Sequence, residues 1–271
     1  MNTILYVLIF IIGTLFGSFY TLAVYRIPKR QDITHTHSYC PNCNHKLGFL
    51  DLIPILSYIF LGGKCRYCKQ KIRPRYLILE VLSGLLFLLF AIITKFTYEN
   101  LTMIKIIEFG FLVLYLTFVI LISGIDKETK KIDKLVIVYG IVISILYMVY
   151  LYIVEKANIY RYVIYLLAYI IILIFDSITL KKHAKDSYLN GLLLMITIMA
   201  VFTTEFVTAN AIIITVLLIA IIELIHKFKN QQNKTKDENK KEKINEIPIG
   251  FYLGISNIFL VVLILAYNYI S

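Results

Sequence analysis

Eight apolar runs, each long enough to cross a lipid bilayer, constrain this chain more than any other feature. A membrane-spanning helix needs about 20 mostly apolar residues, within a usual range of about 17–25. A soluble domain is only about 45–50% apolar, whereas 59% of these 271 residues are hydrophobic. We therefore expect an all-α membrane protein, a polytopic bundle of about eight transmembrane helices. The expected spans are 2–24, 76–94, 104–124, 135–154, 162–179, 188–204, 208–225 and 249–270, of which 188–204 is the shortest.

The distribution of positive charge predicts which loops share one side of the membrane. The formal net charge is +11, which in a soluble protein would suggest nucleic acid as a partner. Here we expect no nucleic acid, because the charge can fix the topology and lie against anionic membrane lipid. All but four of the 28 Lys and Arg residues fall in four loops, and positive loops stay in the cytoplasm. The four loops are 26–75, 125–134, 180–187 and 226–248, and the four exceptions are Lys95, Lys105, Lys156 and Arg161.

This topology places both termini outside and any chemistry at the inner membrane face. The first run is expected to remain as a helix, since a cleaved signal peptide has a basic start and no basic residue precedes Arg26. The tract 229–246 is polar and of low complexity, which predicts a flexible cytoplasmic linker. No soluble segment is large enough to hold an independent active site.

All four cysteines lie in the first of the basic loops, as two C-x-x-C pairs: Cys40, Cys43, Cys65 and Cys68. Two such pairs match the ligand spacing of a tetrahedral four-thiolate zinc site, and a closed site of this kind is structural. Two disulfides or four free thiols are the alternative, but disulfides rarely persist in the cytoplasm. The neighbouring His35, His37 and His45 are interpreted as solvated, because four cysteines already complete the site.

These residues carry a resemblance to the type IV prepilin peptidases, a family of membrane aspartic proteases. The similarity extends more loosely from about residue 90 to the last helix, where 247–250 resembles a family segment. The matching stretches in the N-terminal part are 12–19, 25–28, 40–43, 51–58, 63–68, 75–76 and Glu80. The resemblance implies a multi-pass protein of the bacterial cytoplasmic (inner) membrane, with its active site facing the cytoplasm.

The resemblance also implies two catalytic aspartates near the cytoplasmic ends of helices. Asp126 matches the first, in a segment where Asp133 replaces the family's proline. Asp186 matches the second, although His183 and Lys185 replace the two glycines of the G-x-G-D motif. Asp176 is the alternative second aspartate, since acids inside membrane segments are functional candidates by default.

Two close carboxylates would suit peptide hydrolysis. They cannot both ionise easily, so one keeps a proton. The ionised carboxylate can take a proton from water as the water attacks the scissile carbonyl, while the protonated one hydrogen-bonds the carbonyl oxygen and helps the amine leave. Which aspartate is the base cannot be read from the sequence, because such a pair titrates as a unit.

The resemblance predicts an aspartic endopeptidase that removes the basic leader from prepilins or pseudopilins. It also implies N-methylation of the new N-terminus with S-adenosylmethionine, which no motif in the sequence itself supports. The expected domains are 1–94, enclosing the zinc loop 26–75 as a possible methyltransferase part, and 95–271, a six-helix peptidase core containing the linker. Two alternatives stay open: a catalytically impaired relative that acts as a pilus-assembly scaffold, and a polytopic ion transporter that uses the acids as carriers.

Overall fold

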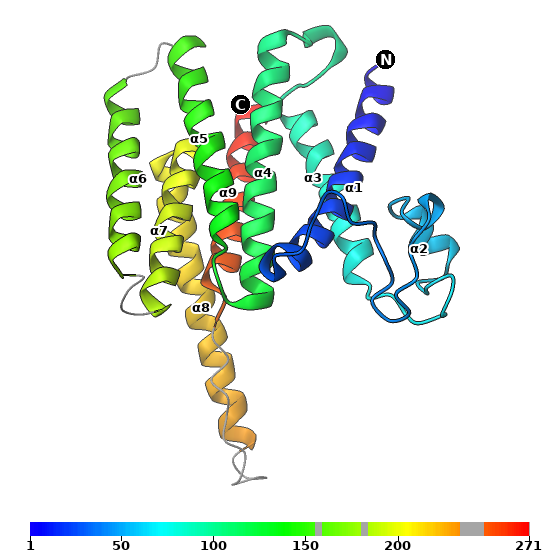
Figure 1. Ribbon diagram of the computed structural model, residues 1–271. Helices are drawn as coiled ribbons and strands as arrows, with labels where there is room; N and C mark the ends of the chain where they lie inside the picture. Colours follow the sequence, from blue (N-terminus) through cyan, green and yellow to red (C-terminus); the bar gives the residue numbers. More distant parts are fainter. Residues whose placement is uncertain (155–158, 180–183, 234–246, 271) are drawn as a thin grey trace. The chain divides into compact units, whose positions relative to one another are not determined.

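The computed structural model describes residues 1–154, 159–179, 184–233 and 247–270, and they form helices without a β-strand. Eight of the helices are long (Figure 1). They are α1 (Asn2–Arg26), α3 (Arg75–Ile93), α4 (Met103–Thr129), α5 (Lys134–Val154), α6 (Ile159–Thr179), α7 (Ala184–Thr203), α8 (Glu205–Asn233) and α9 (Ile249–Ile270). The short elements are α2 (Leu56–Phe60) and the 3-10 turns η1 (Ile27–Lys29), η2 (Phe49–Asp51) and η3 (Tyr98–Asn100).

The expectation of an all-α, multi-pass membrane protein is confirmed. Within the described residues, 7 helices are long and apolar enough to cross a membrane, and all 7 coincide with expected spans. The eighth expected span corresponds to the shorter apolar helix Tyr188–Thr203. The apolar part of α7 is therefore shortest where the sequence already had its shortest apolar run.

Three helix ends differ from the expected loops, and one of them is the start of α7 at Ala184, inside the loop expected at 180–187. Helix α4 continues through Asp126 to Thr129, so Asp126 lies in a helix and not in the loop expected at 125–134. Helix α8 continues to Asn233, so the start of the expected linker is helical, and residues 234–246 lie outside the described part of the chain. A helix can run on past its apolar stretch, because its backbone hydrogen bonds do not require apolar side chains.

The chain forms two compact units, residues 1–113 with 265–271, and residues 114–264. In the first unit, α1 packs closely along α3. A Cβ atom added at Gly13 would lie 2.9 Å from the Cα of Gly84, and one added at Gly17 would lie 2.7 Å from the Cα of Glu80. Gly13 and Gly17 form a G-x-x-x-G pattern, which lets two membrane helices approach at backbone distance.

The second unit contains the larger core. Helix α7 packs against α5, α6 and α8. Its Met195, Ile198 and Met199 are completely buried, as are Phe118 and Ile122 of α4. The helices of this unit alternate in direction, so the last turn of α4, the first turns of α5, α7 and α9, and the end of α6 come to one end of the bundle.

Candidate functional site

The four cysteines form one compact cluster in the first unit. Their sulfur atoms all lie within 4.8 Å of one another, and the Sγ atoms of Cys40 and Cys68 are 3.9 Å apart. That separation is far too long for a disulfide bond of about 2.05 Å. Four thiolates at about 2.3 Å from a zinc ion lie about 3.8 Å from one another in a tetrahedron. The cluster therefore fits a single tetrahedral ion.

Both C-x-x-C pairs are built by the same backbone turn. The N–H of Cys40 donates to the carbonyl of His45 at 3.0 Å, and the N–H of Asn44 donates to the carbonyl of Cys40 at 2.8 Å. In the second turn, the N–H of Cys65 donates to the carbonyl of Gln70 at 2.8 Å, and the N–H of Lys69 donates to the carbonyl of Cys65 at 3.0 Å. Each turn directs two thiols to the same point, which is the reason for the two-residue spacing.

The electrostatics of the cluster also favour a cation. The N–H of Gln70 and the side-chain amide of Asn42 lower the pKa of Cys68 to about 6. The pKa of Cys43 is raised to about 11, because burial and the thiols of Cys40 and Cys68 outweigh the N–H of His45, which lowers it. Because negative charges this close repel one another, a positive ion would stabilise the cluster. Zinc would supply that charge and lock the loop, with no open position for substrate.

A carboxylate ties the second cysteine turn to the segment between the two pairs. Asp51 accepts hydrogen bonds from Arg66 Nε at 2.6 Å, from the Tyr67 hydroxyl at 3.1 Å and from the N–H of Gly48 at 3.1 Å. Burial raises the pKa of Asp51, but Arg66, Gly48 and Tyr67 together hold it below its ordinary value. Since Arg66 and Tyr67 stand between Cys65 and Cys68, Asp51 positions two of the four clustered thiols.

The loop begins from a buried arginine at the end of α1. The guanidinium of Arg26 donates to the backbone carbonyls of Asp32, Thr36 and His37 at 2.8, 2.9 and 3.2 Å. Arg26 is only 4% exposed. A planar group with five donors can hold several carbonyls at once, so Arg26 fixes where the loop leaves the helix.

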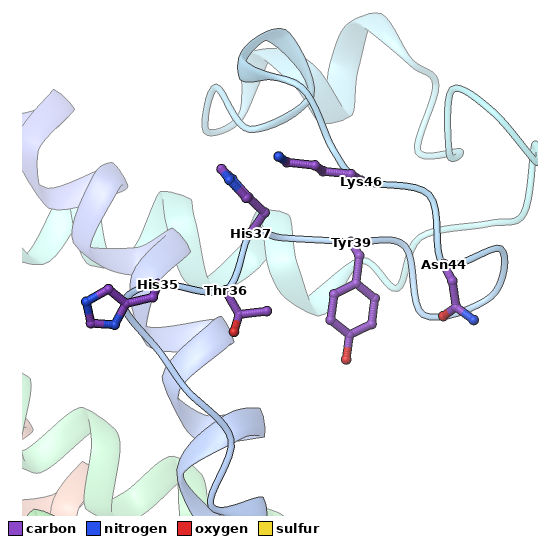
Figure 2. Close-up of a pocket in the computed structure, with 6 residues that line it drawn as sticks. All are labelled: His35, Thr36, His37, Tyr39, Asn44 and Lys46. Carbon is purple, nitrogen blue, oxygen red and sulfur yellow. The ribbon is translucent and has the colours of Figure 1, made fainter.

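The three histidines near the cysteines lie outside the sulfur cluster. His35, His37 and His45 are all exposed, and the ring of His45 lies 3.6 Å from that of Tyr67, centroid to centroid. Figure 2 shows the segment from His35 to Tyr39 beside the turn that carries Asn44 and Lys46. An open hollow there is lined by His35, Thr36, His37, Tyr39, Asn44 and Lys46.

In the second unit, Asp126 lies at the centre of a buried polar cluster. It is completely buried. The Tyr188 hydroxyl donates to its Oδ1 at 3.1 Å, and the N–H of Phe251 donates to its Oδ2 at 3.0 Å. The Tyr188 oxygen in turn accepts the N–H groups of Ile249 at 3.1 Å and Gly250 at 3.5 Å. Asp126 and Tyr188 thus satisfy the first N–H groups of α9, where the helix dipole favours negative charge.

Gly250 makes this close approach possible. A Cβ atom at this position would lie 3.1 Å from Oδ2 of Asp126 and 3.1 Å from Cδ1 of Ile132. The Ser123 hydroxyl also donates to the Gly250 carbonyl at 3.4 Å. The segment Ile247-Pro248-Ile249-Gly250, quoted above for its resemblance, is therefore the wall of the Asp126 cluster.

The other acidic candidates have different surroundings. Asp186 lies in the first turn of α7, two residues before Tyr188, but its side chain and His183 are outside the described part of the structure. Asp176 accepts hydrogen bonds from Lys134 Nζ at 3.2 Å and from Asn190 Nδ2 at 3.3 Å. Asp133 accepts the N–H of Leu135 at 2.8 Å and caps α5. Asp133 thereby starts the helix in place of the family's proline.

Sequence reasoning missed Tyr188, Phe251 and Gly250 as partners of Asp126. Tyr188 lies two residues after Asp186 of the expected second motif, but nothing in this spacing predicts that its hydroxyl donates a hydrogen bond to Asp126. The backbone N–H of Phe251 has no sequence signal at all. Asp51 lay within a matched stretch, and its pairing with Arg66 depends on the fold of the loop.

Comparison with known proteins shows which family the N-terminal part of the chain resembles. Residues 11–94 match the family model described as the bacterial peptidase A24 N-terminal domain. In this segment the chain is similar to the type IV prepilin peptidase family. The matched segment contains most of α1, the whole four-cysteine loop and α3, so the family resemblance expected from the sequence is confirmed.

Relatives named prepilin leader peptidase/N-methyltransferase are similar to a part of the chain of comparable length. The protein from Myxococcus xanthus is 41% identical over 95 residues, covering 34% of this chain and 28% of the relative. Those from Vibrio cholerae (36% over 89 residues) and Bacillus subtilis (41% over 80 residues) cover 30% of this chain and 35% and 32% of their own lengths. The alignments thus span about a third of the curated relatives, and no solved structure matches the chain.

Proposed function

We propose that this protein is a membrane aspartic endopeptidase that removes the leader from type IV prepilins or pseudopilins. The observation that carries the proposal is the match of residues 11–94 to the peptidase A24 N-terminal domain. The relatives that share this segment are named prepilin leader peptidase/N-methyltransferase. The proposal is supported by the buried Asp126 cluster in the second unit, which holds an acid near the end of α4.

In this proposal, Asp126 and Asp186 act as a pair. The hydrogen bond between Tyr188 and Asp126 holds the first turn of α7 beside the last turn of α4, and Asp186 is in that same first turn. Lys185 lies in the helical turn, where the backbone needs no glycine. These placements support a dyad in spite of the altered G-x-G-D motif.

The chain's own residues would perform the hydrolysis. The ionised carboxylate takes a proton from water, whose oxygen attacks the scissile carbonyl carbon. The protonated carboxyl group donates a hydrogen bond to the carbonyl oxygen, the C–N bond then breaks, and the proton passes to the leaving amine. Since Asp126 is completely buried, water and substrate reach it only when the first turn of α7 or of α9 moves aside.

The cysteine cluster has a structural role in this account. Zinc bound by Cys40, Cys43, Cys65 and Cys68 would hold the loop between α1 and α3, without taking part in peptide cleavage. N-methylation of the new N-terminus with S-adenosylmethionine is part of the proposal on the relatives' names alone. We place the protein in the bacterial inner membrane, with the loop and the Asp126 cluster on the cytoplasmic side, from its Lys and Arg distribution.

The transporter alternative is less well supported. Asp126 and Asp176 both lie at the same end of the second unit, Asp176 in an ion pair with Lys134. A cation path needs polar groups across the membrane, whereas these acids mark one end of it. An impaired scaffold protein is separated from the peptidase by a cleavage assay.

The test is leader removal from a co-expressed prepilin, measured as a gel shift. Asp126→Asn and Asp186→Asn should each reduce cleavage by about a thousandfold or more, and the double variant should lose no more, because members of a catalytic unit do not contribute additively. Asp176→Asn and Asp133→Asn are the matched controls and should cleave normally. Normal cleavage by the Asp126→Asn, Asp186→Asn double variant would reject the dyad, and loss in Asp176→Asn alone would reassign its second member.

A further inference from the structure

The four-cysteine loop carries an apolar surface outside the candidate membrane spans. Its members, which we term the apolar edge, are Phe49, Leu50, Leu56, Ile59 and Phe60, and they are 83%, 64%, 50%, 61% and 83% exposed. They lie on η2 and α2, which pack against each other. Exposed apolar surface of this kind marks an interaction site.

The loop folds back along α1 and α3. Ile55, the residue just before α2, donates its N–H to Oε2 of Glu80 at 2.7 Å. Glu80 is buried in α3, five residues after the helix begins at Arg75. At 1.5 Å per residue, this contact lies about 7 Å inside the end of a membrane-spanning helix. Figure 1 shows α2 beside the α1–α3 pair, level with turns of α3.

Helix α1 also places the Glu80 contact inside a candidate membrane span. The backbone of Glu80 packs against Gly17, which is nine residues before the end of α1 at Arg26. That separation corresponds to about 13 Å along the helix. The Glu80 residue that holds Ile55 therefore lies inside the ends of two candidate membrane spans, and α2 begins at the residue after Ile55.

The charges of the loop fit the same partner. Six basic residues accompany the apolar edge: Lys46, Lys64, Arg66, Lys69, Lys71 and Arg73. Basic side chains near a membrane surface attract anionic headgroups. An apolar face flanked by Lys and Arg is the pattern of an element that lies in the interface plane of a bilayer.

We propose that the apolar edge lies in the lipid–water interface and anchors the four-cysteine loop to the bilayer surface. Glu80 sets the depth, since it fixes Ile55 to α3, and the apolar side chains of α2 and η2 enter the headgroup and acyl boundary. The occupant of this surface is phospholipid, and neither a second copy of the chain nor an apolar peptide segment is required.

The chain contains no tryptophan, so a tryptophan introduced at one position reports on that position alone. Phe60→Trp places a single tryptophan on the apolar edge at α2, and Phe49→Trp places one on η2; excitation at the red edge of tryptophan absorption avoids the tyrosines. His37→Trp, on the exposed hollow of Figure 2, is the matched control. Each full-length variant is reconstituted in phosphatidylcholine–phosphatidylglycerol vesicles, and its zinc content is measured to show that the loop is folded.

The readout is quenching by lipids brominated in the acyl chain and by aqueous acrylamide. An interfacial face is buried about 5–10 Å into the headgroup and acyl boundary. In the Phe60→Trp and Phe49→Trp variants we therefore expect blue-shifted emission and about a twofold loss of fluorescence with brominated lipid. The His37→Trp control should instead respond to acrylamide.

Two results would overturn the proposal. Fluorescence of the Phe60→Trp variant that is as sensitive to acrylamide as that of the control, and insensitive to brominated lipid, would place the apolar edge in water. Fluorescence shielded from both quenchers would mean that protein covers the edge, from a second copy or another chain.

Discussion

At the residue scale, Asp126 joins three helices, because its carboxylate lies in α4 and contacts both α7 and α9. Its carboxylate satisfies the first turn of α9 through Phe251, and it is held by Tyr188 from α7. The sequence predicted Asp126 because an acid follows an apolar run in a family-like segment. It could not predict Tyr188, since that contact depends on how α4, α7 and α9 pack.

Tyr188→Phe tests this cluster. The change removes the hydroxyl that bridges Asp126 to the N–H groups of Ile249 and Gly250. We expect the free energy of unfolding in detergent to fall by about 1–3 kcal/mol, the usual cost of leaving buried polar groups unpaired. Tyr267→Phe, at a side chain that is 72% exposed, is the control and should leave the value unchanged. Equal stability of both variants would show that the hydroxyl is dispensable.

Asp51→Asn tests the carboxylate that positions the second cysteine pair. The amide cannot pair with the Arg66 guanidinium as a charge, so Cys65 and Cys68 lose part of their orientation. Residues that orient metal ligands typically change affinity by about 10–100-fold, and we expect zinc affinity to fall by that amount. Competition with a fluorescent chelator measures it. Asp32→Asn, at an acid whose carboxylate accepts hydrogen bonds from Thr34, His35 and Thr36, should bind zinc normally, and a loss there equal to that of Asp51→Asn would contradict the assignment.

At the element scale, the apolar runs predicted the helices well and their ends less well. The spans at 2–24 and 249–270 nearly coincide with α1 and α9, because lipid requires every backbone group to be paired within the helix. The overrun of α4 to Thr129 and of α8 to Asn233 was not predicted. Hydropathy marks where lipid ends, whereas helical hydrogen bonding continues until a turn residue stops it. Lys130, with φ at 57°, is that residue after α4.

The close packing of α1 on α3 gives a prediction of its own. In Gly13→Ala, the new Cβ would meet the Gly84 Cα, the Phe87 Cβ and the Ser83 carbonyl, each at 2.9 Å. Backbone cannot move aside cheaply, so we expect the helices to separate and stability to fall by about 1–3 kcal/mol. Gly110→Ala in α4, with nothing within 4 Å of its new Cβ, is the matched control. Detergent unfolding of the two variants compares them, and equal stabilities would argue against the backbone-to-backbone contact.

At the scale of the whole molecule, the topology rests on the Lys and Arg distribution and can be tested without mutation. A membrane-impermeant, amine-reactive reagent applied to intact cells should modify Lys95 and Lys105 and spare the loop lysines Lys46, Lys64 and Lys131. Inverted vesicles should give the opposite pattern, because positive loops stay in the cytoplasm. Peptide mass spectrometry identifies the modified sites. Labelling of Lys131 in intact cells would mean that its loop lies outside, which contradicts the predicted orientation.

The proposed peptidase function draws on residues of both units, and an activity assay tests it. The N-terminal unit carries the family match and the cysteine cluster, and the second unit carries the buried Asp126. The sequence alone predicted the four cysteines and Asp126, since each lies in a recognisable motif. The surroundings that would make them work, Asp51 in the first unit and Tyr188 in the second, came only from the fold.

The most direct test of the central claim is cleavage of a purified prepilin by the purified, reconstituted protein, followed by mass spectrometry. The account predicts two products separated at the end of the basic leader. It also predicts that the Asp126→Asn, Asp186→Asn double variant, equally folded and equally loaded with zinc, forms neither product. An intact prepilin after prolonged incubation with the folded wild-type protein would contradict the account, as would equal cleavage by the double variant.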